Sequence, residues 1–359
     1  MASRICVIAE AGVNHNGSLE RALLLVDAAV QAGADAVKFQ TFRADALVSR
    51  GAPKAAYQAE RTSASESQHE MIRKLELDEE AHAALMRRCE ASGIEFLSTP
   101  FDIDSLAMLV RRIRLARIKL SSGDLTNAPL LLAAAQAGKP VILSTGMSTL
   151  EEIEAALGVL AFGYAGQDGA PSLQAFAKVF GSASGKAALL EKVTLLHCTT
   201  EYPAPLNEVN LRAMATLRDV FGLPIGYSDH TQGIVVSVAA AALGAVIIEK
   251  HFTLDRNLPG PDHRASLEPG ELTQMVSAIR EIEAALGAPF KQPAAAELKN
   301  IPAARKSLVA GRNIVSGERF TAENLAVKRP GGGLSPMRYW EWLGKIADRD
   351  YRQDDEIRP

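Results

Sequence analysis

The sequence has few cysteines and no long apolar run, and both absences narrow the class of protein. Its three cysteines, Cys6, Cys89 and Cys198, match neither a disulfide framework nor a zinc site, so we expect a protein of the reducing cytoplasm. The apolar part of residues 1–10 is too short for a signal peptide, and no apolar run approaches the ~20 residues of a membrane span. These features predict no membrane partner.

An excess of one charge is also lacking. Lysine and arginine number 39 against 42 aspartates and glutamates, a net charge of −3 that argues against a nucleic-acid partner. No Gly-x-Gly-x-x-Gly follows the first apolar run, which argues against a dinucleotide-binding fold. The hydrophobic content of 47% is ordinary for a globular protein, and 359 residues can hold a barrel of ~250 residues and a small second domain.

What the sequence does contain is an alternation of short apolar runs and helical patterns. The runs predict buried parallel strands at residues 5–9, 35–39, 95–98, 116–120, 140–143, 193–197, 224–227 and 246–250. Helical spacing follows at residues 19–32, 79–92, 103–113, 127–137, 149–160, 208–219, 233–243 and 271–286. Eight strand–helix pairs favour an α/β fold of the closed (β/α)8 TIM-barrel type over an open doubly wound sheet.

Two segments depart from this alternation. Residues 43–68 form a long polar stretch after the second strand, which predicts a lid or a substrate-binding loop. Residues 161–185, rich in Gly, Ala and Ser, predict a surface elaboration before the sixth strand.

The C-terminal part differs in kind from the rest. We expect the barrel at residues 1–290, a linker at 291–301 and a small β-rich domain at 302–359. In that domain, β-prone runs stand among turn signals and predict little core, at residues 307–309, 325–327 and 346–347.

Two late strands end in residues that can bind a metal ion, Ser228-Asp229-His230 and Glu249-Lys250-His251. The ends of parallel strands meet at one face of a barrel, so His230 and His251 could share one divalent metal through imidazole nitrogens. The alternative is that each histidine only satisfies a backbone group. The neighbouring Asp229 and Glu249 favour the metal site.

Two lysines and a glutamate end other strands. Lys38 and Lys119 stand among Ser and Thr hydroxyls and glycine-exposed amides, a combination that predicts a cradle for phosphate or carboxylate. Either lysine could instead extend to solvent or pair with an acid. Glu10, at the end of the first strand, is a candidate acid–base group or stabiliser of an oxocarbenium-like cation; the alternative is a structural partner of a lysine.

Several motifs together resemble the sialic acid synthase family. They are IAEAGVNHNG (residues 8–17), KFQT (38–41), STGM (144–147), GYSDHT (226–231), EKHFT (249–253) and PGPD (259–262). The resemblance covers nearly the whole chain, and VKRPG (residues 327–331) matches the signature of a C-terminal SAF (antifreeze-like) domain. It implies a (β/α)8-barrel transferase that condenses phosphoenolpyruvate with an N-acyl mannosamine-type sugar.

The resemblance also implies roles for individual residues. The catalytic set would be Glu10, Lys38, His230 and His251, in which the two histidines bind a divalent metal, Mn²⁺ or Mg²⁺, near Glu249. Phosphoenolpyruvate would be held by Lys38, Lys119, Ser122, Ser144 and Ser228. The amino sugar would be surrounded by Gln40, Asp124, Tyr202 and Asp262. Arg329 would reach its N-acyl group across a domain-swapped homodimer.

The sequence leaves more than one acceptor sugar and more than one class of reaction open. Asp124 stands where many family members have glutamate and Thr200 where some have asparagine, which favours an N,N'-diacetyllegionaminate synthase, acting on 2,4-diacetamido-2,4,6-trideoxymannose, beside N-acetylneuraminate synthase. A Schiff-base aldolase with Lys119 as nucleophile and a non-catalytic carbohydrate-binding protein also stay open. An octulosonate-phosphate synthase would need an arginine-rich phosphate site that the sequence does not show.

Overall fold

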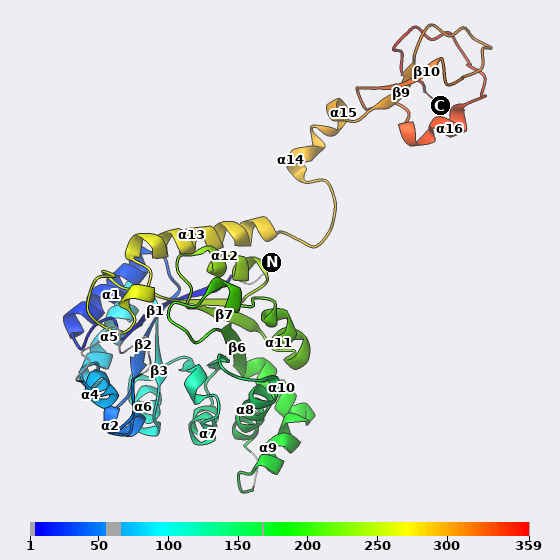
Figure 1. The fold of residues 1–359 in the computed structure, drawn as a ribbon. Coiled ribbons are helices and arrows are strands. Elements are labelled where there is room, and N and C mark those ends of the chain that lie inside the picture. The colour runs from blue at the N-terminus through cyan, green and yellow to red at the C-terminus, as the bar shows by residue number, and fades with distance from the viewer. Residues whose placement is uncertain (1–3, 55–65, 167–168, 359) are drawn as a thin grey trace. The chain divides into compact units, whose positions relative to one another are not determined.

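Eight parallel strands form one sheet in the first of two units into which the chain divides, Met1–Gly287 and Ala288–Pro359 (Figure 1). The structure is a computed structural model, and it describes residues 4–54, 66–166 and 169–358. The sheet order is β3-β2-β1-β8-β7-β6-β5-β4, and its end strands β3 and β4 lie side by side, so the sheet is a nearly closed barrel. The strands are β1 Cys6–Gly12, β2 Ala36–Thr41, β3 Glu95–Pro100, β4 Ile118–Leu120, β5 Val141–Ser144, β6 Val193–Cys198, β7 Ile225–Asp229 and β8 Ile247–His251.

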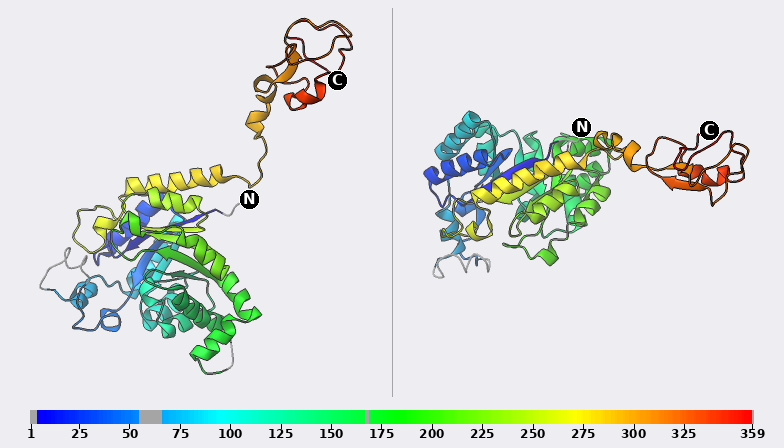
Figure 2. Two further views of the ribbon diagram at one scale, coloured as in Figure 1. Left: turned by 45° about the vertical axis from the view of Figure 1, so that its right-hand side comes forward. Right: turned by 90° about the horizontal axis from the view of Figure 1, so that it is seen from above.

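Helices cover the outside of this sheet (Figure 1, Figure 2). Those of the strand–helix repeat are α1 Leu19–Gln31, α5 Glu79–Ser92, α6 Ile103–Met108, α7 Ala128–Gln136, α8 Leu150–Tyr164, α11 Ala213–Phe221, α12 Val235–Ala242 and α13 Pro269–Leu286. The predicted (β/α)8 barrel is therefore confirmed. None of the helices in the described ranges is long and apolar enough to cross a membrane.

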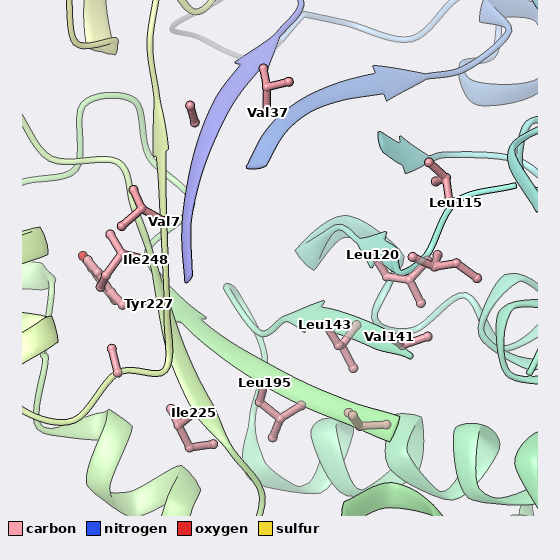
Figure 3. Close-up of a cluster of buried hydrophobic side chains, with 14 of the residues drawn as sticks. Val7, Val37, Leu115, Leu120, Val141, Leu143, Leu195, Ile225, Tyr227 and Ile248 are labelled. Carbon is pink, nitrogen blue, oxygen red and sulfur yellow. The ribbon is translucent and has the colours of Figure 1, made fainter. Parts of the chain in front are cut away.

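The alternation of side chains along each strand separates two apolar layers. One set of residues faces the helices and includes Val7, Val37, Leu195 and Ile225, which are among the side chains drawn in Figure 3. The other set forms a separate cluster inside the barrel: Ile8, Ala36, Leu97, Ile142, Leu196 and Ile247. The inner layer fills the barrel below the C-terminal ends of the strands, as in other small barrels.

Parts of the segment 161–185, which the sequence predicted as a surface elaboration, are helical. Helix α8 continues to Tyr164, and α9 Leu173–Phe180 and α10 Ala183–Lys192 follow it. The aromatic rings of Phe162 and Phe176 meet edge to face with centroids 5.3 Å apart. Helix α9 is stabilised by tertiary packing of its buried Phe176 and Val179.

The segment 43–68 also contains structure. A short helix, α2 Ala44–Leu47, begins it, and α4 Gln68–Arg73 follows directly after it, with a capping box between Ser67 and Glu70. Residues 55–65 of the predicted loop lie outside the described residues.

The second unit has a core of its own. Strands β9 Ser307–Ala310 and β10 Leu325–Lys328 pair antiparallel, whereas Ile346 forms an isolated bridge with Arg319. The short helices of this unit are α14 Ala295–Leu298, α15 Ile301–Ala304 and α16 Tyr339–Trp342. Ten buried apolar side chains form the core, more than the sequence predicted: Leu308, Ala310, Ile314, Phe320, Leu325, Leu334, Trp342, Ala347, Tyr351 and Ile357.

A substitution at Gly226 of β7 would test how tightly the inner apolar layer is packed. A Cβ there would lie 2.5 Å from Leu196 Cδ2 and 2.6 Å from the Ile247 carbonyl oxygen, inside the barrel. We expect Gly226→Ala to lower the free energy of unfolding by about 1–3 kcal/mol, because an added methyl overpacks the layer. The measurement is urea denaturation. Gly270→Ala, whose Cβ would meet no atom within 4 Å, is the control and should not destabilise; equal losses in both variants would contradict the packing argument.

Candidate active site

The interior of the barrel changes from apolar to polar two residues further along each strand. Glu10 follows Ile8 at this spacing, Lys38 follows Ala36, and Glu249 follows Ile247. The same step places Thr99, Ser144, Cys198 and Ser228 at strand ends, and Lys119 on β4 points the same way. These residues line one cavity of about 290 Å³ at the C-terminal ends of the strands. Because alternate residues of a strand face the same side, the polar residues that follow the inner apolar layer all face the cavity.

Two lysines and two glutamates form a chain of ion pairs in this cavity. Lys38 Nζ lies 2.7 Å from Glu10 Oε2 and 3.7 Å from Glu249 Oε2. Lys119 Nζ lies 3.6 Å from Glu249 Oε1. All four side chains are buried. Such charges are tolerated in a barrel only because each one faces an opposite charge.

The two glutamates have different pKa values because their surroundings differ. Burial raises the pKa of Glu10 to about 7, although Lys38 opposes the shift. Burial would also raise the pKa of Glu249, but Lys119, Lys38 and a hydrogen bond from Ser228 outweigh it and lower the pKa to about 2. Glu249 is therefore a permanent carboxylate, whereas Glu10 can exchange a proton near neutral pH.

Hydroxyl groups surround the two lysines. Lys119 Nζ donates to Ser144 Oγ at 2.6 Å, and Lys38 Nζ donates to Thr99 Oγ1 at 3.0 Å. Ser228 Oγ donates to Glu249 Oε1 at 2.9 Å. The backbone amide of Gly146 donates to Ser122 Oγ at 2.9 Å. The five residues predicted to hold phosphoenolpyruvate thus line a single cavity.

Glycine is required at position 146 for this arrangement. A Cβ there would lie 2.3 Å from Thr200 Oγ1 and 2.9 Å from Cys198 Sγ. The turn after β5 can therefore approach β6 only without a side chain.

His230 and His251 lie side by side in the cavity, with ring centroids 5.6 Å apart. His230 Nδ1 is 2.6 Å from the Thr199 carbonyl oxygen, which can only accept, so Nδ1 carries the proton. The lone pair that could bind a metal is on Nε2, which lies 3.5 Å from Ser228 Oγ. His251 Nδ1 is buried and has no hydrogen-bond partner among the described residues. Burial lowers the pKa of His230 to about 4 and that of His251 well below its usual value, so both rings are neutral.

The two imidazoles fit a divalent metal ion. A nitrogen ligand stands ~2.1 Å from the metal, so two neutral rings at this separation can reach one ion. Within residues 4–54, 66–166 and 169–358, no group of three or more His, Cys, Asp or Glu side chains is arranged to hold a metal. His230 and His251 could supply two ligands from the chain, with substrate or water completing the coordination.

The residues predicted around the sugar are not all in the cavity. Gln40, Tyr202 and Asp262 line it, and the Tyr202 ring lies over His230 with centroids 4.2 Å apart. Asp124 is buried but does not line the cavity, because its carboxylate accepts hydrogen bonds from Ser121 Oγ at 2.6 Å and Asn127 Nδ2 at 3.1 Å. Arg329 belongs to the second unit, where its side chain is exposed.

Strand parity also separates Asp229 from His230, with which the sequence had grouped it. His197 and Asp229 are one position out of step with the inward set and face the helices. His197 Nε2 lies 2.8 Å from the Val209 carbonyl oxygen. Parity could likewise have identified Thr99, a cavity residue that the sequence analysis did not single out.

A buried ion pair stands behind the two histidines. Lys250 Nζ lies 3.0 Å from Asp229 Oδ2, and both side chains are fully buried. Asp229 also accepts hydrogen bonds from Thr231 Oγ1 and Ser237 Oγ. Because Asp229 precedes His230 and Lys250 precedes His251, the pair joins β7 to β8 next to both candidate ligands.

The fold and the site define a (β/α)8-barrel enzyme, because active sites of this fold lie at the C-terminal ends of the strands. Comparison with known proteins identifies the family. Residues 25–291 match the NeuB family and residues 305–359 match the SAF domain. The chain therefore belongs to the NeuB family and carries a C-terminal SAF domain.

Relatives cover nearly the whole chain. It is 50% identical to the N,N'-diacetyllegionaminic acid synthase of Campylobacter jejuni over 352 residues, 98% of each chain. It is 44% identical to the enzyme of the same name from Legionella pneumophila, over 94% of this chain and 89% of the relative. A crystal structure of N-acetylneuraminic acid (sialic acid) synthetase from Leptospira borgpetersenii is 34% identical, with a TM-score of 0.67 and coverage of 84% and 91%.

The ion pair between Asp229 and Lys250 generates a prediction about stability. Lys250→Met should lower the free energy of unfolding by about 3–5 kcal/mol, because it leaves the Asp229 charge buried without its counter-ion. Lys328→Met, which removes the exposed pair with Asp354, is the control and should cost less than about 1 kcal/mol. Urea denaturation measures both. Equal small losses would show that the buried pair is not needed.

Proposed function

We propose that the chain is a nonulosonic acid synthase, which condenses phosphoenolpyruvate with an N-acylated mannosamine-type sugar and water and releases phosphate. The observation that carries this proposal is the buried chain of Lys38, Glu10, Glu249 and Lys119 in one cavity with two neutral histidines. Membership of the NeuB family and the identity to legionaminic acid synthases support it.

Lys38 and Lys119 would bind the phosphate and carboxylate of phosphoenolpyruvate, helped by the hydroxyls of Ser122, Ser144 and Ser228. Two buried cations suit a ligand with several negative charges, since the low-dielectric cavity strengthens each attraction. Protonation of Glu10, whose pKa is about 7, would free Lys38 for the ligand. These contacts hold the enol carbon C3 towards the acceptor.

In the reaction, C3 of phosphoenolpyruvate bonds to the aldehyde carbon of the open-chain sugar, whose oxygen takes up a proton. Positive charge develops at C2, water adds its oxygen there, and the C2–O bond to phosphate breaks, so that inorganic phosphate leaves. Glu10 as a carboxylate would stabilise the charge at C2 and accept a proton from the water. Its pKa allows both protonation states during turnover.

His230 and His251 would hold a divalent metal, which we propose to be Mn²⁺ or Mg²⁺. When bound, it supplies Lewis-acid polarisation of the aldehyde oxygen. Glu249 stays ionised beside this position. Asp262 Oδ2 lies 3.9 Å from His251 Nδ1, from where it can orient the ring or the sugar.

We propose 2,4-diacetamido-2,4,6-trideoxymannose as the acceptor and N,N'-diacetyllegionaminic acid as the product. The two legionaminic acid synthases at 50% and 44% identity favour this sugar over N-acetylmannosamine. The second candidate is N-acetylneuraminate synthesis, supported by the Leptospira relative at 34% identity.

A Schiff-base aldolase with Lys119 as nucleophile is favoured by one observation only, the burial that lowers the pKa of this lysine. Its pairing with Glu249 and its hydrogen bond to Ser144 suit a charged lysine instead. Borohydride trapping with pyruvate would detect the aldolase. A protein that only binds carbohydrate has no use for the buried Lys38–Glu10 pair.

The remaining assignments rest on the resemblance. We propose a catalytic domain at residues 1–290, a linker at 291–301 and the SAF domain at 302–359, in a domain-swapped homodimer where Arg329 contacts the N-acyl group. Asp124 is better explained as a residue that holds the turn after β4 through Ser121 and Asn127. The three free cysteines agree with a cytoplasmic protein.

The proposed reaction predicts phosphate release from phosphoenolpyruvate only when a sugar and a divalent metal are present. The measurement offers Mn²⁺ with 2,4-diacetamido-2,4,6-trideoxymannose or N-acetylmannosamine, with and without chelator. We expect chelator-sensitive release that is faster with the diacetamido sugar. Release without any sugar, or none with either sugar, would refute the proposal.

The metal assignment predicts different effects for two strand-end histidines. Loss of a group that hydrogen-bonds to a metal ligand typically lowers metal affinity by roughly 10- to 100-fold. His230→Ala removes a ligand itself, so it should weaken Mn²⁺ binding by more than this. His197→Ala is the matched control, because His197 lies near the end of β6 but faces away from the cavity, and Mn²⁺ affinity should stay unchanged. Isothermal titration with Mn²⁺ gives both affinities. Equal affinities in the two variants would remove His230 as a ligand.

A further inference from the structure

One side of the active-site cavity is apolar and has no part in the proposed chemistry. We call it the apolar wall. It is made by seven residues of the loops after β1, β2 and β3 and of helices α2 and α4: Val13, Phe42, Leu47, Met71, Ile72, Leu75 and Phe101. Among the described residues that line the cavity from these three loops and two helices, every side chain is apolar. The polar lining residues Lys119, Ser144, Ser228 and the two histidines come instead from the ends of β4, β5, β7 and β8.

The apolar wall is a built surface with fixed supports. Val13, Phe42 and Leu75 form a buried cluster against which Leu47, Ile72 and Phe101 pack. Helices α2 and α4 are joined by His69 Nε2, which lies 2.9 Å from Asp45 Oδ1.

Two backbone contacts fix the same region. The amide of Ala44, at the start of α2, donates to Glu76 Oε1 at 2.6 Å. Behind α4, a Cβ on Gly17 would lie 2.4 Å from the Lys74 carbonyl oxygen, so the loop after β1 packs directly against this backbone. A wall held at both ends can discriminate between ligand shapes.

We infer that the apolar wall binds the methyl-bearing end of the acceptor sugar and selects a deoxy, doubly acetamido sugar over one richer in hydroxyls. The inference rests on the proposed function, because it assumes that an acceptor with its aldehyde at the histidines occupies this cavity. The cavity is continuous from His230 and His251 to the wall, so the distal part of that acceptor meets apolar side chains.

The physical reason is the asymmetry between methyl and hydroxyl groups at such a surface. A hydroxyl placed there loses its water and finds no partner, whereas a methyl group gains from burial. 2,4-Diacetamido-2,4,6-trideoxymannose carries a methyl at C6 and acetamido groups at C2 and C4. N-Acetylmannosamine has a hydroxymethyl at C6 and a hydroxyl at C4. One methylene in an apolar pocket discriminates by roughly 10- to 200-fold.

The test measures kcat/KM for both sugars at saturating phosphoenolpyruvate in variants of the wall. Ile72→Gln and Leu47→Gln change half-buried members, so the barrel should fold, and melting temperatures check this. Ile282→Gln on α13 is the matched control, because Ile282 is also half-buried but lies outside the cavity. We expect each wall variant to lower the diacetamido-to-monoacetamido ratio of kcat/KM by roughly 10-fold or more, while the KM for phosphoenolpyruvate stays unchanged.

The outcomes separate this inference from the proposed function. Wall variants that lose both sugars equally, or that keep the wild-type ratio, would overturn the role of the wall while leaving the synthase assignment intact. A shift of the same size in Ile282→Gln would overturn it too. A wild-type protein that releases phosphate with neither sugar would overturn the proposed function and this inference together.

Discussion

The structure depends on one constraint, the need to pair four charged side chains that are buried at the end of a barrel. Lys38, Glu10, Glu249 and Lys119 are tolerated only while each lies within reach of an opposite charge. These residues come from β2, β1, β8 and β4, so the pairing requires a sheet that curves back on itself in the correct register. The site is therefore assembled only when the barrel closes.

The apolar layer beneath the four charged side chains supports this arrangement. Ile8, Leu97, Ile142, Leu196 and Ile247 fill the barrel and keep water away from the charged layer on that side. The low dielectric strengthens the attraction for an anionic ligand. It also makes the pKa values of the two glutamates differ, so that Glu249 is permanently ionised and Glu10 has a pKa of about 7. The same burial that costs stability therefore prepares the site to take a charged substrate and to move a proton.

Sequence reasoning predicted the barrel because its signals are local. Apolar runs and helical spacing recur at the right lengths, and a capping box of Thr149 and Glu152 marks the start of α8. It did not predict helices α9 and α10 in and after residues 161–185, where Phe176 packs on Phe162. Nor did it show that His197, unlike His230, faces away from the cavity, because that depends on which side of each strand faces inward.

The sequence by itself determined the residue types at the strand ends and the family to which they belong, since both are written in contiguous motifs. Only the tertiary structure decided which of those residues meet. Lys38 and Glu249 lie 3.7 Å apart although 211 positions (249 − 38) separate them, a contact set by strand order and closure. The turn after β4 directs Asp124 to Ser121 and Asn127, and the apolar wall joins three loops and two short helices. Such contacts depend on long-range geometry, which no local period of the sequence encodes.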